Sequence, residues 1–136
     1  MCRFLADTEE TLALGRKLSR GFVAGDIVLL EGELGVGKTT LVRGILDGLG
    51  FHDTVRSPTY NLIQTFETVP PVMHADLYRV DSFAGIGIED YLDSHLCLIE
   101  WPERARGLVD PIRCWRIAMS FDGDGRRVQI EEPEAR

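Results

Sequence analysis

The strongest constraint on the fold is a glycine-rich segment at residues 32–39, which reads GELGVGKT. It matches the G-x-x-x-x-G-K-[ST] pattern of a phosphate-binding loop at every fixed position. Such a loop needs a buried strand before it and a helix after it. The apolar run at 26–31 and the helix-like run at 38–48 supply both. The sequence therefore predicts an α/β fold in which this loop joins a strand to a helix.

The residue types in the loop indicate a nucleoside triphosphate as ligand. Gly32, Gly35 and Gly37 let successive backbone N–H groups turn toward phosphate oxygens. The helix that follows adds its unpaired N–H groups and the positive end of its dipole. Lys38 would reach the β- and γ-phosphates, and the Thr39 hydroxyl would bind Mg²⁺. A chance glycine-rich turn is the alternative, and the matching flanks make it the weaker interpretation.

Composition and net charge limit the classes of protein to which the chain can belong. The chain of 136 residues is 44% apolar and 27% charged, which is typical of one globular domain spanning 1–136. A net charge of −7 argues against a protein that binds nucleic acid by itself, because contacts between basic side chains and phosphates supply most of the affinity for nucleic acid. No stretch approaches the ~18 apolar residues of a membrane span, and no apolar signal core begins the chain. Three cysteines without metal-ligand spacing fit a reducing compartment. We therefore expect a cytoplasmic protein with no membrane contact.

The remaining pattern predicts a mixed central sheet flanked by helices and ending in a β-hairpin. A helix begins at Asp7 or Thr8, where a capping residue precedes acids in the first turn. Strands are predicted at 60–67, 72–78 and 95–100, a short helix at 88–93, and the hairpin at 113–121 and 126–131.

Two acids are candidates for the chemistry beyond the loop. Glu100 follows a buried apolar strand, so its carboxylate would emerge at the carboxyl end of the sheet, where ligands of α/β folds collect. Asp76 ends its own strand and could contact Mg²⁺ through water or orient a nucleophile. The alternatives are that Glu100 caps a neighbouring helix and that Asp76 forms a salt bridge with Arg79.

Aromatic and imidazole side chains are less informative. Trp101 follows Glu100 directly, so it could stack on a base or a partner surface, or pack at the sheet edge. His52, His74 and His95 show neither metal-ligand spacing nor a nucleophile partner, which favours structural roles.

Four sequence blocks in series carry a family resemblance. They are GELGVGKTT at 32–40, SPTYNLI at 57–63, HADLYR at 74–79 and LIEWPER at 98–104. In this order they resemble the bacterial TsaE family, the small ATPase of the system that makes threonylcarbamoyladenosine in tRNA. The phosphate loop alone is shared with many proteins, whereas the four blocks together are specific.

The resemblance implies roles for particular positions. Lys38 corresponds to the phosphate lysine, and Thr39 and Glu100 to the two Mg²⁺ ligands. Asp76 corresponds to an acid that serves hydrolysis, which makes Lys38, Asp76 and Glu100 the expected catalytic set. The segment 57–59 resembles a switch loop that senses the γ-phosphate. Further nucleotide contacts are implied for Thr8, Glu33, Gly35, Val36, Gly37, Thr40 and Glu103.

The identity of the base rests chiefly on the resemblance. No Asn-Lys-x-Asp motif for reading guanine is present, and the family implies ATP. The chain after Arg104 does not align by motif, so an adenine contact from Arg126 or Arg127 stays open.

Together with this resemblance, the sequence predicts a Mg²⁺-dependent ATPase that is weak alone; the resemblance implies that it drives the cycle of a complex with the TsaD and TsaB subunits. Contact with tRNA would be indirect, through those partners. Two other classes remain: a nucleotide-gated adaptor without important turnover, and a small-molecule kinase. The kinase is disfavoured because only about fifty residues separate the loop helix from Glu100 and no arginine-rich lid is visible.

Overall fold

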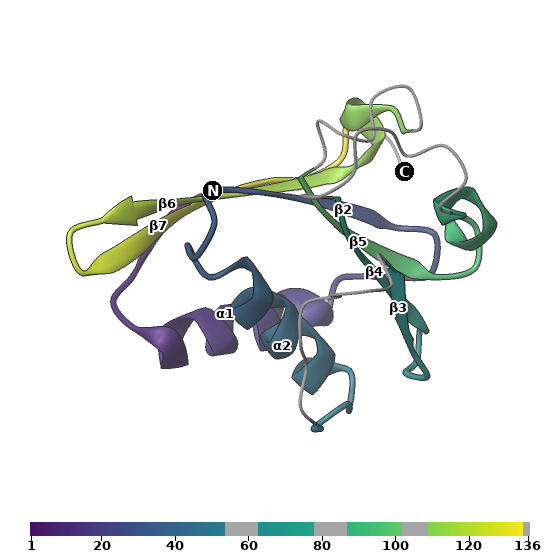
Figure 1. Ribbon diagram of the computed structural model, residues 1–136, viewed down its shortest axis with the longest axis horizontal. Helices are drawn as coiled ribbons and strands as arrows, with labels where there is room; N and C mark the ends of the chain where they lie inside the picture. The colour runs from purple at the N-terminus through teal and green to yellow at the C-terminus, as the bar shows by residue number, and fades with distance from the viewer. Residues whose placement is uncertain (54–62, 78–86, 102–108, 135–136) are drawn as a thin grey trace.

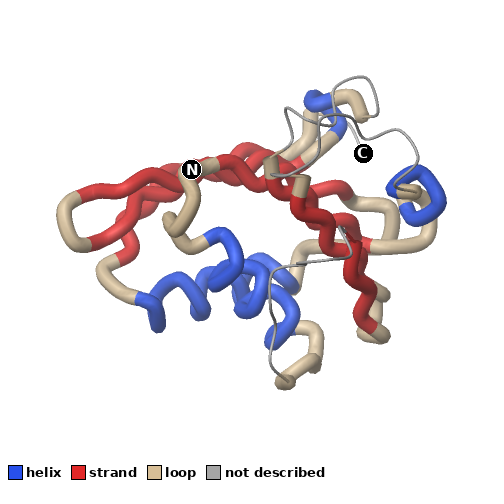
Figure 2. The backbone as a smooth tube through the Cα atoms, in the orientation of Figure 1, coloured by secondary structure: helices blue, strands red, loops and turns tan. Residues whose placement is uncertain are grey.

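A computed structural model describes residues 1–53, 63–77, 87–101 and 109–134. A seven-stranded mixed sheet runs through these residues in the order β1-β7-β6-β2-β5-β4-β3 (Figure 1, Figure 2). The four central strands, β6, β2, β5 and β4, are parallel, and the outer pairings are antiparallel. The strands are β1 (Cys2–Leu5), β2 (Ile27–Glu31), β3 (Ile63–Phe66), β4 (Val72–Asp76), β5 (Leu96–Glu100), β6 (Trp115–Asp122) and β7 (Gly125–Glu131).

Two α-helices pack together on one face of the sheet (Figure 1). They are α1 (Thr8–Ser19) and α2 (Lys38–Gly48). Asp7 caps α1, because its side chain accepts a hydrogen bond from the Glu10 backbone N–H at 2.9 Å. Two short 3₁₀ turns, η1 (Ile88–Tyr91) and η3 (Pro111–Arg113), complete the described elements. This arrangement confirms the predicted α/β class and mixed sheet.

The helices touch backbone to backbone where glycines face each other. A Cβ added at Gly44 would lie 2.5 Å from the Leu12 carbonyl oxygen, and one added at Gly15 would lie 2.7 Å from the Ile45 amide nitrogen. Glycine is therefore required at both positions for α1 to lie this close to α2. Because the phosphate loop leads directly into α2, this contact fixes the loop relative to the start of α1.

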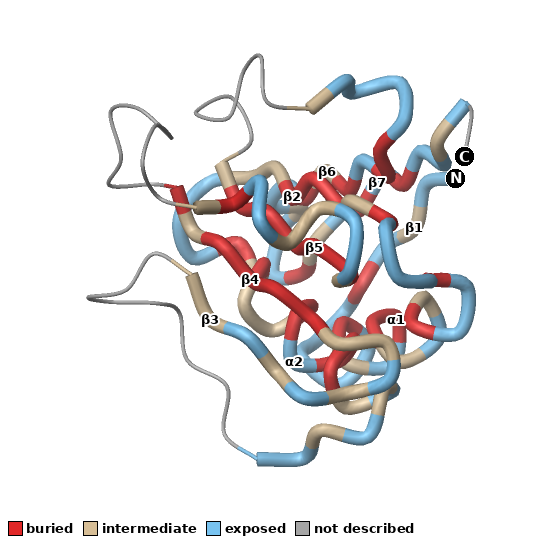
Figure 3. The backbone as a smooth tube through the Cα atoms, turned by 90° about the vertical axis from the view of Figure 1, so that its right-hand side faces the viewer, coloured by how far each residue is buried: buried red, intermediate tan, exposed pale blue. Residues whose placement is uncertain are grey.

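The apolar core lies on both faces of the sheet. One cluster fills the space between the sheet and the two helices, and a smaller one lies on the opposite face beside η1. Strand β5 is buried along its whole length, and Figure 3 shows the buried residues concentrated in the central strands. Continuous burial on both faces is typical of a central parallel strand.

Several predicted boundaries shift in the structure. The 60–67 strand is observed at 63–66, with 60–62 outside the described residues, and the 72–78 strand ends at Asp76. The predicted helix at 88–93 is the single 3₁₀ turn η1. The hairpin is confirmed as β6 and β7, while β1 was not predicted at all. Across the described part of the chain, every helix is too short or too polar to span a bilayer.

Candidate nucleotide-binding site

The phosphate loop occupies the junction between β2 and α2, as its sequence predicts. Gly37 is the N-cap of α2 and has a φ of 115°, a left-handed conformation that favours glycine. Gly37 has no side chain to cap the first N–H groups of α2, while its carbonyl oxygen accepts the helical hydrogen bond from the Leu41 N–H at 3.0 Å. The first N–H groups of α2 are therefore suited to bind an anion that is not part of the helix.

Contacts with Gly32 and Trp101 hold Lys38 inside the loop. Its side chain is largely buried, and Nζ donates a hydrogen bond to the Gly32 carbonyl oxygen at 2.5 Å. The same Nζ lies 3.8 Å from the centroid of the Trp101 ring, within cation–π range. Trp101 adopts a φ of 61°, uncommon for a bulky residue, and its backbone N–H donates to the Leu30 carbonyl at 3.3 Å. The structure thus places Trp101 against Lys38, the predicted phosphate lysine.

The two candidate acids meet at the carboxyl ends of their strands. Asp76 and Glu100 are register partners in the parallel β4–β5 pair, and Leu30 of β2 is the partner of Glu100 on the other side. A single cavity is lined by Lys38, Thr39, Asp76, Glu100 and Trp101, together with glycines of the loop. The structure therefore brings together the predicted phosphate lysine, the predicted metal-binding hydroxyl and both candidate acids.

Glu100 is buried and has a partner that sequence reasoning did not assign. Its Oε2 lies 2.6 Å from Nε2 of His74, and both side chains are almost inaccessible to water. His74 and Asp76 are two residues apart on β4, so their side chains share one face of the sheet. That spacing, combined with Asp76 as a site residue, is the signal that could have found His74.

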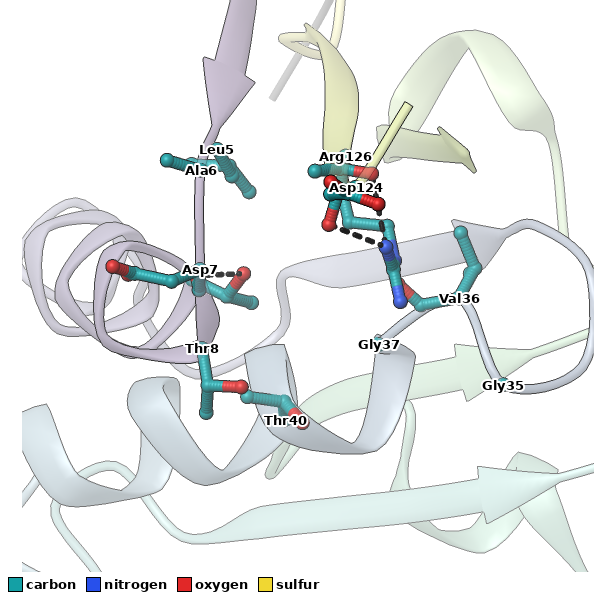
Figure 4. Close-up of a pocket in the computed structure, with 12 residues that line it drawn as sticks. Leu5, Ala6, Asp7, Thr8, Gly35, Val36, Gly37, Thr40, Asp124 and Arg126 are labelled. Carbon is teal, nitrogen blue, oxygen red and sulfur yellow. Dashed lines mark hydrogen bonds between the residues drawn. The ribbon is translucent and has the colours of Figure 1, made fainter. Parts of the chain in front are cut away.

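A second cavity adjoins the loop on the other side (Figure 4). It lies between the start of α1, the phosphate loop and the β6–β7 turn, and Arg126 Nε donates to the Val36 carbonyl at 2.8 Å. Arg127 instead forms an ion pair with Asp122 at 2.7 Å. The lining includes five of the predicted nucleotide contacts, Thr8, Gly35, Val36, Gly37 and Thr40.

The remaining predicted nucleotide contacts are Glu33, Glu103 and the segment 57–59, and Glu33 lines neither of the two cavities. Glu33 is exposed on the outer turn of the loop, where its carbonyl accepts a hydrogen bond from the Val36 N–H at 3.2 Å. Its contact with a nucleotide stays a prediction. Glu103 and the segment 57–59 lie outside the described residues.

The donor set of the first cavity suits Mg²⁺ bound together with phosphates. It offers the Thr39 hydroxyl and the carboxylates of Asp76 and Glu100, all hard oxygen donors. Within the described ranges, no cluster of three or more His, Cys, Asp or Glu residues forms a self-sufficient metal site. Few protein ligands are the expected situation for Mg²⁺, which keeps several waters and binds substrate phosphates.

Comparison with known proteins identifies the family of the chain. The family profile "Threonylcarbamoyl adenosine biosynthesis protein TsaE" matches residues 5–128. The chain belongs to the TsaE family. The tRNA threonylcarbamoyladenosine biosynthesis protein TsaE of a Nostoc species is 42% identical over 132 residues, which cover 91% of this chain and 80% of that protein. The protein of the same name from Haemophilus influenzae is 31% identical over 140 residues, covering 96% and 88%.

A solved structure agrees with the fold of this TsaE family member. The crystal structure of Bacillus subtilis YdiB superposes with a TM-score of 0.84 at 26% identity. The match covers 98% of this chain and 85% of the YdiB chain.

Proposed function

We propose that this chain is a Mg²⁺-dependent ATPase acting in the biosynthesis of threonylcarbamoyladenosine in tRNA. Family membership supports the pathway, since the relatives are described as biosynthesis proteins for this modification. The observation that carries the ATPase assignment is the cavity shared by Lys38, Thr39, Asp76 and Glu100. Hydrolysis of a triphosphate needs a phosphate clamp, a metal site and a group that positions water, and these four residues supply all three.

Each side chain has a distinct task in this proposal. Lys38 leaves the Gly32 carbonyl and the Trp101 ring to bind the β- and γ-phosphates. Thr39 and Glu100 would hold Mg²⁺, which when bound would neutralise charge on the phosphate oxygens. Asp76 accepts a hydrogen bond from the attacking water and orients it toward the γ-phosphorus.

The second cavity would hold the nucleoside. It opens beside the same loop, so a nucleotide whose phosphates contact Lys38 can extend past Thr40 toward Thr8 and Arg126. In this proposal, the predicted contacts in the loop and at the start of α1 bind different parts of the same nucleotide. ATP is proposed as the substrate from the resemblance to the TsaE family.

Turnover would serve a larger assembly. The chain carries a net charge of −7, which disfavours direct binding of tRNA. We propose that the TsaD and TsaB subunits hold the tRNA and perform its chemistry, and that ATP hydrolysis by this chain drives their cycle.

The test is ATP hydrolysis by this chain, alone and with the TsaD–TsaB pair. Lys38→Ala should abolish turnover that the partners stimulate. Lys17→Ala, which removes the chain's other lysine from the exposed side of α1, should retain it. Tight ATP binding without any stimulation would refute the ATPase proposal and favour the nucleotide-gated adaptor.

A further inference from the structure

The buried contact between His74 and Glu100 has no role in the proposed function. The His74 side chain is 0% exposed and the Glu100 side chain 4% exposed, and they meet at 2.6 Å. A carboxylate removed from water is costly unless hydrogen bonds compensate it. An ionised carboxylate can only accept, so His74 must donate through its Nε2–H group. In a neutral imidazole this contact selects the Nε2–H tautomer of His74.

The contact with His74 orients the Glu100 carboxylate as well as supplying it with a hydrogen bond. Nε2 of His74 contacts Oε2 of Glu100, and both side chains are buried. Glu100 also lines the cavity that contains Thr39 and Asp76. Holding Oε2 on one side leaves Oε1 as the oxygen for a ligand in that cavity.

A second observation points to a support behind His74. Gln64 of β3 is the direct register partner of His74 in the antiparallel β3–β4 pair, so both side chains project from the same face. Within the described residues, His74 Nδ1 and Gln64 Oε1 are both buried without a hydrogen-bond partner. Rotating the Gln64 amide by half a turn exchanges its oxygen for an N–H donor. That donor suits the Nδ1 acceptor of the tautomer that Glu100 requires.

We propose that His74 is a positioning residue that holds Glu100 in the orientation for binding Mg²⁺, with Gln64 fixing the His74 tautomer from the neighbouring strand. The inference rests on the proposed function, because it assigns Glu100 as a metal ligand. Metal-ligating carboxylates are commonly oriented by such outer hydrogen bonds, and losing one costs about 10–100-fold in metal affinity or activity.

Three substitutions separate hydrogen bonding from packing. In His74→Gln the amide nitrogen lies at about the distance of Nε2 from the backbone, so the donor to Glu100 is retained. In His74→Asn the donor is one carbon too short, and in His74→Leu it is absent. His52→Leu is the control, because His52 is exposed and contacts Asp47 at the far end of α2.

The readout is the affinity for Mn²⁺, used in place of Mg²⁺, in the full chain loaded with a non-hydrolysable ATP analogue and followed by electron paramagnetic resonance. We expect His74→Leu and His74→Asn to weaken Mn²⁺ by about 10–100-fold. His74→Gln should stay near the wild-type value, and His52→Leu should be unchanged. Binding of the analogue in EDTA should be similar in all variants, since the phosphate loop is untouched.

A second readout does not depend on metal or nucleotide. Two-bond ¹H–¹⁵N correlation spectra should show His74 of the free protein as the Nε2–H tautomer. An Nδ1–H tautomer, or equal Mn²⁺ affinities for His74→Gln and His74→Asn, would overturn the inference. If the wild type fails to bind Mn²⁺ with the analogue, the proposed function fails and the inference fails with it. If the wild type and all variants bind Mn²⁺ equally well, the inference about His74 is wrong while the proposed function stands.

Discussion

The contact between α1 and α2 predicts a large effect from one added methyl group. In Gly44→Ala the new Cβ would lie 2.5 Å from the Leu12 carbonyl oxygen, 3.0 Å from Leu12 Cα and 3.1 Å from Gly15 Cα. All three are backbone atoms, so no side-chain rotation can relieve the overlap. The helix α1 must move away from α2.

The magnitude follows from two opposing effects. Overpacking a well-packed interface costs about 1–3 kcal/mol, and a clash with backbone lies at the upper end. Alanine improves on glycine inside a helix by up to about 1 kcal/mol. We therefore expect the free energy of unfolding to fall by about 1–2 kcal/mol.

The same movement should reach the nucleotide site. Thr8 at the start of α1 lines the second cavity together with Gly37 and Thr40. Displacing α1 changes the distance across that cavity while leaving the phosphate loop in place. Gly44→Ala should weaken an ATP analogue more than it weakens pyrophosphate, which contacts the loop alone.

Urea denaturation and titration with both ligands measure these effects. Gly21→Ala is the control, because the nearest atom to its added Cβ is the Leu18 carbonyl oxygen at 3.8 Å. A Gly44→Ala protein as stable as Gly21→Ala would refute the account of the helix contact. Equal weakening of the two ligands would refute the placement of the nucleoside.

Three further predictions concern single side chains. Arg126→Ala removes the hydrogen bond to the loop carbonyl, and hydrogen bonds to charged groups contribute about 1.5–3 kcal/mol. The variant should therefore bind ATP roughly tenfold more weakly in calorimetry, whereas Arg127→Ala should leave the affinity unchanged. Asp76→Asn should retain ATP binding and reduce partner-stimulated turnover by at least tenfold in a phosphate-release assay, and unchanged turnover would exclude its role with water. Burial raises the pKa of Cys97 to about 12 and that of Cys114 to about 11, from 9.0. Between pH 9 and these raised pKa values, the thiols ionise in the unfolded chain but not in the folded one. The free energy of unfolding should therefore be intact below pH 9 and fall as the pH rises toward 11–12, measured by urea titration at each pH. A free energy of unfolding that does not change over this range would contradict the prediction.

The phosphate loop and the central strands could be predicted because their signals are local. The glycine spacing specifies a conformation, and continuous apolar runs such as 96–99 specify burial on both faces. The meeting of Asp76 and Glu100 was also predictable in outline, since both end strands of one parallel sheet.

Other features depend on contacts that local patterns do not encode. Strand β1 has only four residues, and it forms because Phe4 and its neighbours pair with β7, more than a hundred residues later. The role of His74 depends on the orientation of one ring toward Glu100. The choice between Arg126 and Arg127 at the second cavity is set by hairpin register, because adjacent strand residues point to opposite faces.

The most direct test of the proposed ATPase cycle is repeated modification of tRNA by the complete complex with a Glu100→Ala chain. Formation of threonylcarbamoyladenosine would be counted per complex over many turnovers, with Glu131→Ala at the exposed end of β7 as the control. If hydrolysis drives the cycle, the Glu100→Ala complex should stop after about one round while the control continues. Sustained modification by Glu100→Ala at the wild-type rate would contradict the central claim.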